Sequence, residues 1–219
     1  MMLYRPGRAI SWAFFKIFCR MEVVGADIPR SGGCLLVANH ISHLDPPLVG
    51  AAIRRMVYFM AKQELFEIPI LGSIIAGTGA FPVKRGTADR GALKRAWTLL
   101  RDGNVVCIFP EGRRSPDGTL QSAEAGAALV AAQSNVPVVP LGLIGTADVL
   151  PPGGVVLHPH PVKVIVGEPL HLDDLRAEKY DRLLLNEIGR RMMDGIAGAV
   201  RQGLNANAGL QKRGNHKSK

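Results

Sequence analysis

Cysteine is scarce in this chain, and no long apolar run occurs in it. The three cysteines, Cys19, Cys34 and Cys107, are odd in number, widely spaced and embedded in apolar sequence, which predicts buried thiols in a reducing compartment. The first apolar run is broken by Lys16 and is far shorter than the roughly 20 residues that a membrane-spanning helix needs. No small-residue cleavage site follows before Glu22, which argues against a signal peptide.

Two common catalytic patterns are also missing. The chain contains no Gly-x-Ser-x-Gly sequence, the sharp turn that presents the nucleophile of many serine hydrolases. Its histidines fit neither His-Glu-x-x-His nor the paired Cys and His pattern of zinc sites. A chain of 219 residues is long enough for one domain with a sizeable core. A catalytic site is therefore expected among other polar residues, placed by a single fold.

Acidic residues are absent from both ends of the chain. Of the 27 basic residues, four lie in residues 1–20 and four in residues 211–219, and neither segment has an acid. The rest of the chain carries 19 basic and 18 acidic residues. A nearly neutral body with basic ends favours an anionic surface as partner. Nucleic acid is disfavoured, because no basic stripe is interleaved with aromatics.

The N-terminal residues 1–21 predict an amphipathic helix that lies in the headgroup plane of a membrane. Five apolar residues share one helical face: Ile10, Phe14, Ile17, Phe18 and Met21. Trp12 and Phe15 fall off this stripe, and basic residues accompany it. The competing interpretation is a helix that docks on its own domain. At the other end, residues 205–219 have no apolar period and predict a basic disordered tail.

Between these ends, residues 22–204 predict one α/β domain. Short apolar runs typical of buried strands occur at 22–24, 34–38, 56–60, 105–109, 136–144 and 162–166. Segments with helical patterns separate them, at 45–53, 68–77, 88–102, 123–133 and 174–204. The alternation predicts a mainly parallel sheet flanked by helices.

The clearest candidate for chemistry is the stretch after the run at 34–38, which reads Asn-His-Ile-Ser-His-Leu-Asp-Pro-Pro. His40 is expected where a strand ends, and Asp45, before two prolines, is expected to be the N-cap of the next helix. A carboxylate five residues after the histidine can fold back onto one ring nitrogen and leave the other free to take a proton. The pattern indicates either a general base with its orienting carboxylate or a plain helix cap beside an ordinary hydrogen-bonded histidine.

Two more polar clusters follow predicted strands. Lys84 and Arg85 come after residues 80–83, and Glu111 and Arg114 come after residues 105–109. In an open parallel sheet, ligands bind at the carboxyl ends of the strands, so all three clusters are expected to converge there. A base with guanidinium groups suited to bidentate phosphate contact predicts an anionic substrate that carries a hydroxyl.

These blocks together resemble the glycerolipid acyltransferase family, most closely its bacterial 1-acylglycerol-3-phosphate (lysophosphatidate) acyltransferases. The four blocks, in family order, are Asn39 to Asp45, Gly79 to Gly86, Phe109 to Ser115 and Val136 to Pro140. The resemblance covers about residues 20 to 170. It implies transfer of a fatty acyl group from an acyl thioester to the sn-2 hydroxyl, giving phosphatidate in phospholipid biosynthesis.

The resemblance also implies roles for the matching residues. His40 would be the base that deprotonates the hydroxyl, with Asp45 orienting it. Arg85 would hold the phosphate of the acceptor, and Glu111 with Gly112 would shape the acceptor site.

Lys62 matches a basic position common in relatives, and we expect it near the donor thioester. Arg114 is a further candidate for phosphate binding. Arg113 departs from the family, which usually has Thr there.

The implied partners are lysophosphatidate, an anionic membrane surface, and acyl-CoA or acyl carrier protein as co-substrate, with no cofactor and no metal. The implied location is the cytoplasmic face of the cell membrane, peripheral or monotopic. Three alternatives stay open. The first is that the acceptor is another lyso-lipid. The second is that the protein is a metal-dependent hydrolase that uses His40, His43 and Asp45. The third is that it is a non-enzymatic basic membrane-binding module.

Overall fold

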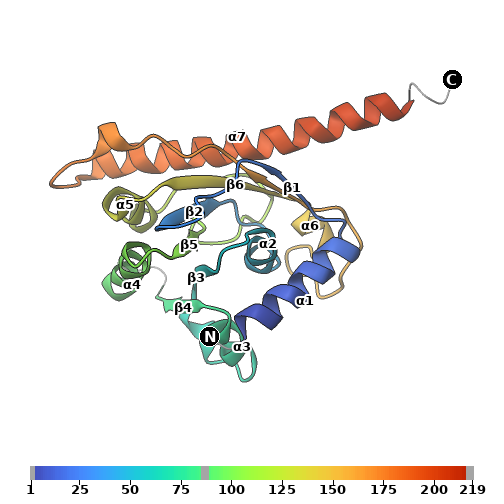
Figure 1. The fold of residues 1–219 in the computed structure, drawn as a ribbon, viewed down its shortest axis with the longest axis horizontal. Coiled ribbons are helices and arrows are strands. Elements are labelled where there is room, and N and C mark those ends of the chain that lie inside the picture. Colours follow the sequence, from blue (N-terminus) through green and yellow to red (C-terminus); the bar gives the residue numbers. More distant parts are fainter. Residues whose placement is uncertain (1–2, 85–88, 216–219) are drawn as a thin grey trace.

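The fold is an α/β sandwich built on one mixed sheet (Figure 1). A computed structural model describes residues 3–84 and 89–215, with side chains described up to residue 205. Within these residues the sheet has seven strands in the order β1-β7-β6-β2-β5-β3-β4. Neighbouring strands run parallel except β6 and β7, which are antiparallel. The predicted fold class, a mainly parallel sheet flanked by helices, is confirmed.

The strands follow the apolar runs of the sequence. Their bounds are β1 Glu22–Gly25, β2 Cys34–Ala38, β3 Val57–Lys62, β4 Ala80–Val83, β5 Val105–Ile108, β6 Val138–Ile144 and β7 Lys163–Val166. The strand β2 is central, and all five of its residues are buried. A strand covered on both faces reads as a continuous apolar run, because neither face meets water.

Helices cover both faces of the sheet. Their bounds are α1 Tyr4–Ile17, α2 Asp45–Ala52, α3 Leu71–Gly77, α4 Arg90–Arg101, α5 Ala125–Ser134, α6 Thr146–Val149 and α7 Arg182–Asn215, with 3₁₀ helices η1 Gln63–Phe66 and η2 Asp173–Leu175. One core cluster joins α1 and α2 to the face of β2 that carries Leu36. The other joins α4, α5 and α7 to the face that carries Leu35.

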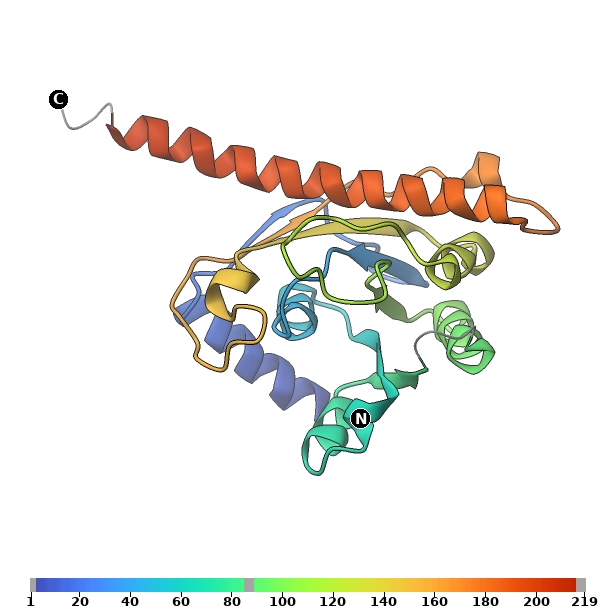
Figure 2. The ribbon, with the colours of Figure 1, turned by 180° about the vertical axis from the view of Figure 1, so that it is seen from behind.

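The helix α7 packs along the sheet and then extends past it (Figures 1 and 2). It packs closely on β6, where a Cβ on Gly142 would lie 2.7 Å from the backbone of Ala199. The prediction of a disordered tail from residue 205 is wrong as far as Asn215, because α7 continues to that residue. Six of residues 205–215 are alanine, leucine, glutamine, lysine or arginine, which have high helix propensity, and the other five are asparagine or glycine.

The helix α1 is present, but the predicted apolar stripe packs only in part: Phe14 and Phe18 lie against the core. The helix ends at Ile17, and Phe15, placed off the stripe by the sequence, is buried against the domain. Ile10 and Ile17, from the stripe, are 71% and 82% exposed. The helix therefore docks on its own domain through one face and leaves apolar residues exposed on others. No helix in the described part of the chain is long and apolar enough to cross a bilayer.

Candidate active site

The candidate site begins at the carboxyl end of the central strand β2. Asn39, the first residue after β2, is buried, and its side chain forms two hydrogen bonds with the backbone of Leu143 in β6. The Asn39 amide donates to the Leu143 carbonyl at 2.9 Å, and the Leu143 N–H donates to Asn39 Oδ1 at 2.8 Å. These bonds fix the point at which the chain leaves the sheet, so the next residue, His40, has a defined position.

His40 and Asp45 form the pair that the sequence predicts. His40 Nδ1 lies 2.8 Å from Asp45 Oδ2, and both residues are buried, with His40 7% exposed. Asp45 is the first residue of α2 and not its N-cap, which is Leu44. Its carboxylate turns back and accepts hydrogen bonds from the backbone N–H groups of Ile41 and Ser42, at 2.7 and 2.8 Å. The N-cap prediction is therefore wrong, because the side chain serves the preceding loop.

This geometry defines the roles of the two ring nitrogens of His40. Oδ2 of Asp45 accepts three hydrogens, so Nδ1 of His40 is the donor in their contact. Nε2 is then the nitrogen that can accept a proton. The other carboxylate oxygen, Oδ1, is buried and has no hydrogen-bond partner among the described residues. The phenyl ring of Phe109 stacks on the imidazole, with ring centroids 4.1 Å apart. The ring is therefore held on its edge by Asp45 and on its face by Phe109.

The loop after β5 is tied to the backbone of His40 from both sides. The His40 N–H donates to Glu111 Oε1 at 3.2 Å, and the Ser115 N–H donates to the His40 carbonyl at 2.7 Å. Glu111 Oε2 accepts from the N–H of Gln121 at 3.2 Å. Desolvation by burial raises the pKa of Glu111. Both oxygens of this buried carboxylate thus hold backbone amides, so Glu111 acts by fixing the loop around His40.

Gly112 and Arg114 belong to the same loop. Gly112 has φ +68°, and a Cβ there would lie 2.9 Å from the side chain of Glu124, so both conformation and space favour glycine. Arg114 is half-buried. Desolvation by burial, followed by the charge of Arg114, lowers the pKa of His43. Arg114 therefore places positive charge close to the loop that carries His40.

The remaining predicted residues lie toward the edge of the sheet. Lys62 ends β3, is exposed, and pairs with Glu64 at 3.1 Å. Lys84 follows β4, and its N–H donates to Asp89 Oδ2 at 2.9 Å. Because β4 is three strands from β2, its end is about 14 Å away at the usual strand spacing. Arg85 lies outside the described residues. The Glu111 loop therefore meets His40 and Asp45, and the convergence of Lys84 and Arg85 on the same place stays a prediction.

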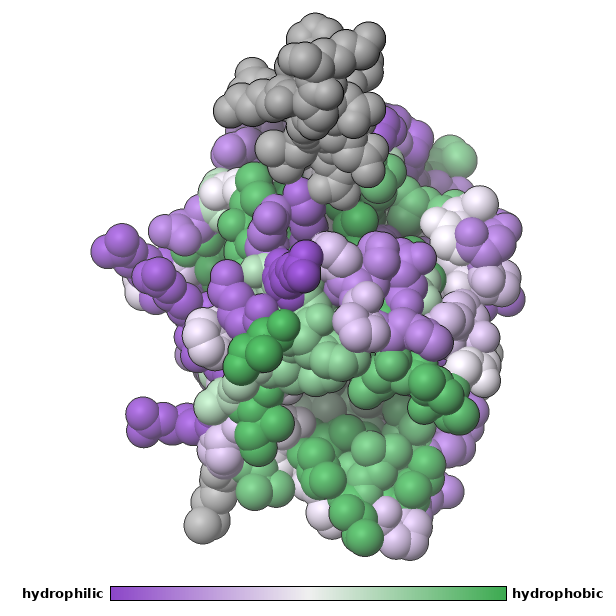
Figure 3. All heavy atoms as spheres, turned by 90° about the vertical axis from the view of Figure 1, so that its right-hand side faces the viewer, coloured by the Kyte–Doolittle hydropathy of each residue, from purple (hydrophilic) through white to green (hydrophobic). Residues whose placement is uncertain are grey.

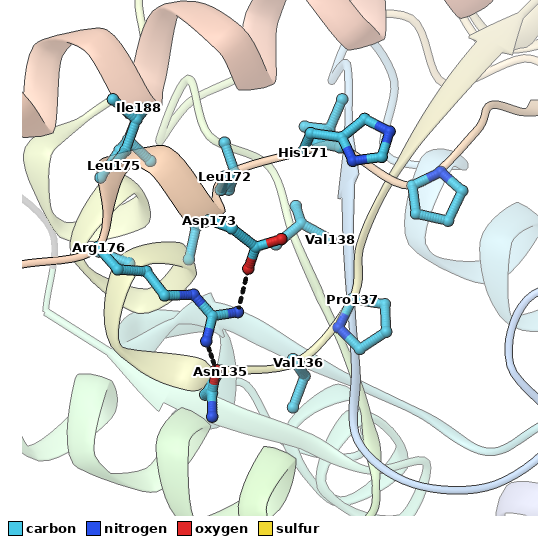
Figure 4. Close-up of a pocket in the computed structure, with 14 residues that line it drawn as sticks. Asn135, Val136, Pro137, Val138, His171, Leu172, Asp173, Leu175, Arg176 and Ile188 are labelled. Atoms are coloured by element: carbon cyan, nitrogen blue, oxygen red, sulfur yellow. Dashed lines mark hydrogen bonds and ion pairs between the residues drawn. The ribbon is translucent and has the colours of Figure 1, made fainter.

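The groups named for a hydrolase do not assemble as metal ligands. In residues 3–84 and 89–215, no three His, Cys, Asp or Glu side chains are grouped so that they hold a metal. A cavity of about 280 Å³ lies elsewhere, between α5, η2 and α7 (Figure 4). Its lining near the start of β6 includes Val136, Val138, residues 169–173, Leu175 and Arg176, and it contains no predicted site residue. The candidate site lies at the opposite end of that strand.

Sequence reasoning assigned no role to three residues that build the site. Asn39 locks β2 to β6, Phe109 stacks on His40, and Ser42 joins the site to a distant segment. The Ser42 hydroxyl donates to the carbonyl of Leu150 at 3.0 Å. All three lie close to predicted catalytic residues, in the loops that follow β2 and β5. This position after a buried strand was the feature of the sequence from which a role could have been predicted.

Arg113, the departure from the family pattern, is exposed. Its Nε donates to Gln121 Oε1 at 3.0 Å. Gln121 is also the residue whose N–H is held by Glu111. Arg113 therefore reinforces the loop that surrounds His40.

The arrangement agrees with the similarity of the chain to known proteins. A family profile described as Acyltransferase matches residues 20–144. The chain is 37% identical over 168 residues to a chloroplastic 1-acyl-sn-glycerol-3-phosphate acyltransferase of Arabidopsis thaliana, covering 73% of this chain and 47% of that protein. It is 30% identical over 149 residues to the 1-acyl-sn-glycerol-3-phosphate acyltransferase of Bacillus subtilis, covering 68% and 72%.

A crystal structure gives the same result. The 1-acyl-sn-glycerophosphate (LPA) acyltransferase PlsC of Thermotoga maritima aligns with a TM-score of 0.68 and 28% identity, over 87% of this chain and 78% of that one. The chain spans about half the length of the chloroplast relatives that it matches. The matched profile includes both the His40–Asp45 segment and the loop after β5. The chain belongs to the acyltransferase family.

Proposed function

We propose that the protein transfers a fatty acyl group from an acyl thioester to the sn-2 hydroxyl of 1-acylglycerol 3-phosphate, giving phosphatidate. The observation that carries this proposal is the 2.8 Å contact between His40 Nδ1 and Asp45 Oδ2 at the carboxyl end of β2. Relatives from Bacillus subtilis and Arabidopsis thaliana named for this activity support the choice of reaction.

The reaction begins when Nε2 of His40 removes the proton from the hydroxyl of the acceptor. The hydroxyl oxygen attacks the thioester carbonyl carbon, and the carbonyl π electrons move to oxygen to form a tetrahedral intermediate. This intermediate collapses, the carbon–sulfur bond breaks, and the thiolate leaves and takes the proton from the imidazolium. Asp45 stabilises the imidazolium in both steps through its contact with Nδ1. General base assistance of this kind contributes roughly 10²–10⁴-fold.

Positive charge near the base accounts for an anionic acceptor. Arg114 lies in the loop whose backbone is bonded to His40, and its charge lowers the pKa of His43. A guanidinium in this position suits bidentate contact with a phosphate. We assign the acceptor phosphate to Arg114, together with Arg85, whose role rests on the family resemblance.

The donor is an acyl-CoA or an acyl carrier protein thioester, which acts as co-substrate, and the proposed chemistry needs no cofactor. Lys62 at the end of β3 is the basic residue proposed to lie near this donor. Its position is one strand beyond β5, which precedes the Glu111 loop.

A membrane surface is the proposed location of the reaction, on the cytoplasmic face. The exposed side chains of Ile10, Trp12 and Ile17 on α1 support it. Apolar side chains are less favourable in water than in the interface of a bilayer, so contact with a membrane would stabilise them. Basic residues on the same helix, with no acid in residues 1–20, favour anionic lipid.

A thiol-release assay with a panel of acceptors tests the proposed function. Purified protein is mixed with acyl-CoA and lysophosphatidate, glycerol 3-phosphate or a neutral lyso-lipid, and free thiol and lipid product are measured. We expect the highest kcat/KM with lysophosphatidate and formation of phosphatidate. A second candidate, another lyso-lipid acceptor, is favoured by the extra guanidinium of Arg113 and would show a different order. Thiol release with no acylated acceptor would contradict acyl transfer.

A further inference from the structure

The segment between α6 and β7, residues 151–161, displays apolar side chains to solvent. Its sequence, Pro-Pro-Gly-Gly-Val-Val-Leu-His-Pro-His-Pro, contains no charged residue. Three consecutive side chains are exposed at its centre: Val155 by 91%, Val156 by 61% and Leu157 by 43%. Single exposed apolar residues are common on proteins, but three in a row on a projecting loop usually mark an interaction site.

The loop is held in place at its base. The N–H of His158 donates to the carbonyl of Val149 at 2.8 Å, and the N–H of Gly154 donates to the carbonyl of Pro151 at 2.9 Å. His160 Nδ1 lies 3.7 Å from a carboxylate oxygen of Asp148. These contacts close the loop on itself while leaving Val155 and Val156 outside. The apolar exposure therefore belongs to a shaped loop.

The loop continues the exposed apolar surface of α1. The N–H of Val162, directly after the loop, donates to the carbonyl of Cys19 at 3.0 Å, two residues beyond the end of α1. Both ribbon views show the loop beside the C-terminal part of α1 (Figures 1 and 2). Hydrophobic residues gather over the lower part of the face on this side (Figure 3). On α1, Ile17 is the most exposed of the large apolar side chains, at 82%.

Charge on this side of the molecule favours a lipid partner. Lys16 and Arg20 are exposed near the end of α1, and neither residues 1–20 nor residues 151–161 contain an acid. Apolar side chains next to cationic ones match an anionic bilayer surface, and the nearby acids Asp148 and Glu22 are each paired with a basic side chain.

The base of the loop is connected to the candidate active site. Leu150, directly before the loop, accepts the hydroxyl of Ser42 at 3.0 Å. The N–H of Ser42 donates to Oδ2 of Asp45, the same oxygen that contacts His40. One residue thus links the loop to the carboxylate that orients the base.

We propose that residues 151–161 form a second membrane-contact element, which inserts Val155 and Val156 into an anionic bilayer beside α1. Together the two elements hold the candidate active site at His40 against the lipid surface from which the acceptor arrives. The inference rests on the proposed function, since it assigns the surface on which that reaction occurs.

A double substitution with a matched control tests the inference. Full-length protein carrying Val155→Ser and Val156→Ser is compared with wild type and with Leu183→Ser, which changes an equally exposed apolar residue at the start of α7. Flotation with vesicles of phosphatidylcholine and phosphatidylglycerol measures binding. Full burial of one valine is worth about tenfold or more in partitioning, so the double variant should bind at least about tenfold more weakly. Leu183→Ser should bind as wild type does.

A second readout separates this inference from the proposed function. Acyl transfer is measured with lysophosphatidate embedded in the vesicles and with a short-chain lysophosphatidate that stays monomeric in water. We expect the double variant to lose activity with the embedded acceptor and to keep wild-type activity with the monomeric one. Equal vesicle binding by wild type and double variant would overturn membrane contact by the loop. A lower molar mass of the double variant in light scattering, with unchanged vesicle binding, would instead assign the loop to a second copy of the chain.

Absence of acyl transfer by wild type to both acceptors would contradict the proposed function and leave the flotation result intact. The two conclusions therefore fail separately.

Discussion

Asp45→Asn is the substitution whose consequence follows most directly from the geometry. Oδ2 of Asp45 accepts hydrogen bonds from His40 Nδ1 and from the N–H groups of Ile41 and Ser42, while Oδ1 is buried without a partner among the described residues. Asparagine has one oxygen and one NH₂ group for these two positions. If its oxygen replaces Oδ2, the NH₂ group is buried without a partner at the position of Oδ1. If its NH₂ group replaces Oδ2, it faces two backbone donors.

Both arrangements carry a cost in stability and in rate. A buried polar group without a partner costs about 1–3 kcal/mol of unfolding free energy. In the first arrangement His40 loses the charge-assisted contact that stabilises its imidazolium. In the second, Nδ1 of His40 must accept a hydrogen, so Nε2 carries the proton and cannot act as a base. We therefore expect kcat to fall by about 10²–10⁴-fold.

The assay is thiol release from acyl-CoA with lysophosphatidate, together with urea unfolding of the same samples. Asp102→Asn is the matched control, because Asp102 is an exposed residue at the C-terminal end of α4 and the substitution is the same. The control should keep wild-type kcat and stability. Wild-type turnover by a folded Asp45→Asn protein would refute the orienting role of this carboxylate.

Three further predictions concern the surroundings of His40. Arg114→Ala should raise the KM for lysophosphatidate more than it lowers kcat. Desolvation and then the charge of Arg114 lower the pKa of His43, so the same substitution should raise that pKa in an NMR titration. An unchanged KM would count against phosphate binding by Arg114. Phe109→Leu should lower kcat by about two- to twelvefold with little change in KM. This fold-change in kcat corresponds to the ~0.5–1.5 kcal/mol that a stacked aromatic pair contributes. An unchanged kcat would show that stacking does not position His40. Burial raises the pKa of Glu111 above its ordinary 4.5, so its contribution to stability is full below that pH and is lost as pH rises through the raised pKa. The difference in unfolding free energy between wild type and Glu111→Gln should therefore shrink from pH 4 to pH 7, and a difference that grows would contradict desolvation as the cause.

The sequence was sufficient for the fold class and for the pair at the centre of the site. Buried parallel strands such as β2 are continuous apolar runs, and this pattern is visible without knowledge of their neighbours. His40 and Asp45 are five residues apart in one loop, so local geometry alone limits their separation. The position of both could therefore be predicted from the chain.

The residues that support the pair depend on strand order, which the sequence pattern did not determine. Asn39 bonds to Leu143, 104 residues away, and this contact exists only because β6 is next to β2. Strand order also places β4 at the edge of the sheet, three strands from β2, so Lys84 does not lie directly beside His40.

Helical periodicity identified the packed face of α1 only in part. Phe14 and Phe18 of the predicted stripe lie against the core, but the domain also buries Phe15, which is off the stripe, and leaves Ile17 exposed. Periodicity gives the faces of a helix, while the shape of the surface beneath it decides which face is covered. The same limit applies to Glu111, whose two backbone contacts are set by loop geometry.

The central claim is that His40 removes the proton from the acceptor hydroxyl. The most direct measurement is kcat for phosphatidate formation by His40→Ala, with His171→Ala, an exposed histidine beside the cavity at the other end of β6, as control. The account predicts a loss of at least about 10²-fold for His40→Ala, with an unchanged circular dichroism spectrum, and wild-type turnover for His171→Ala. Turnover near the wild-type value in a folded His40→Ala protein would contradict it.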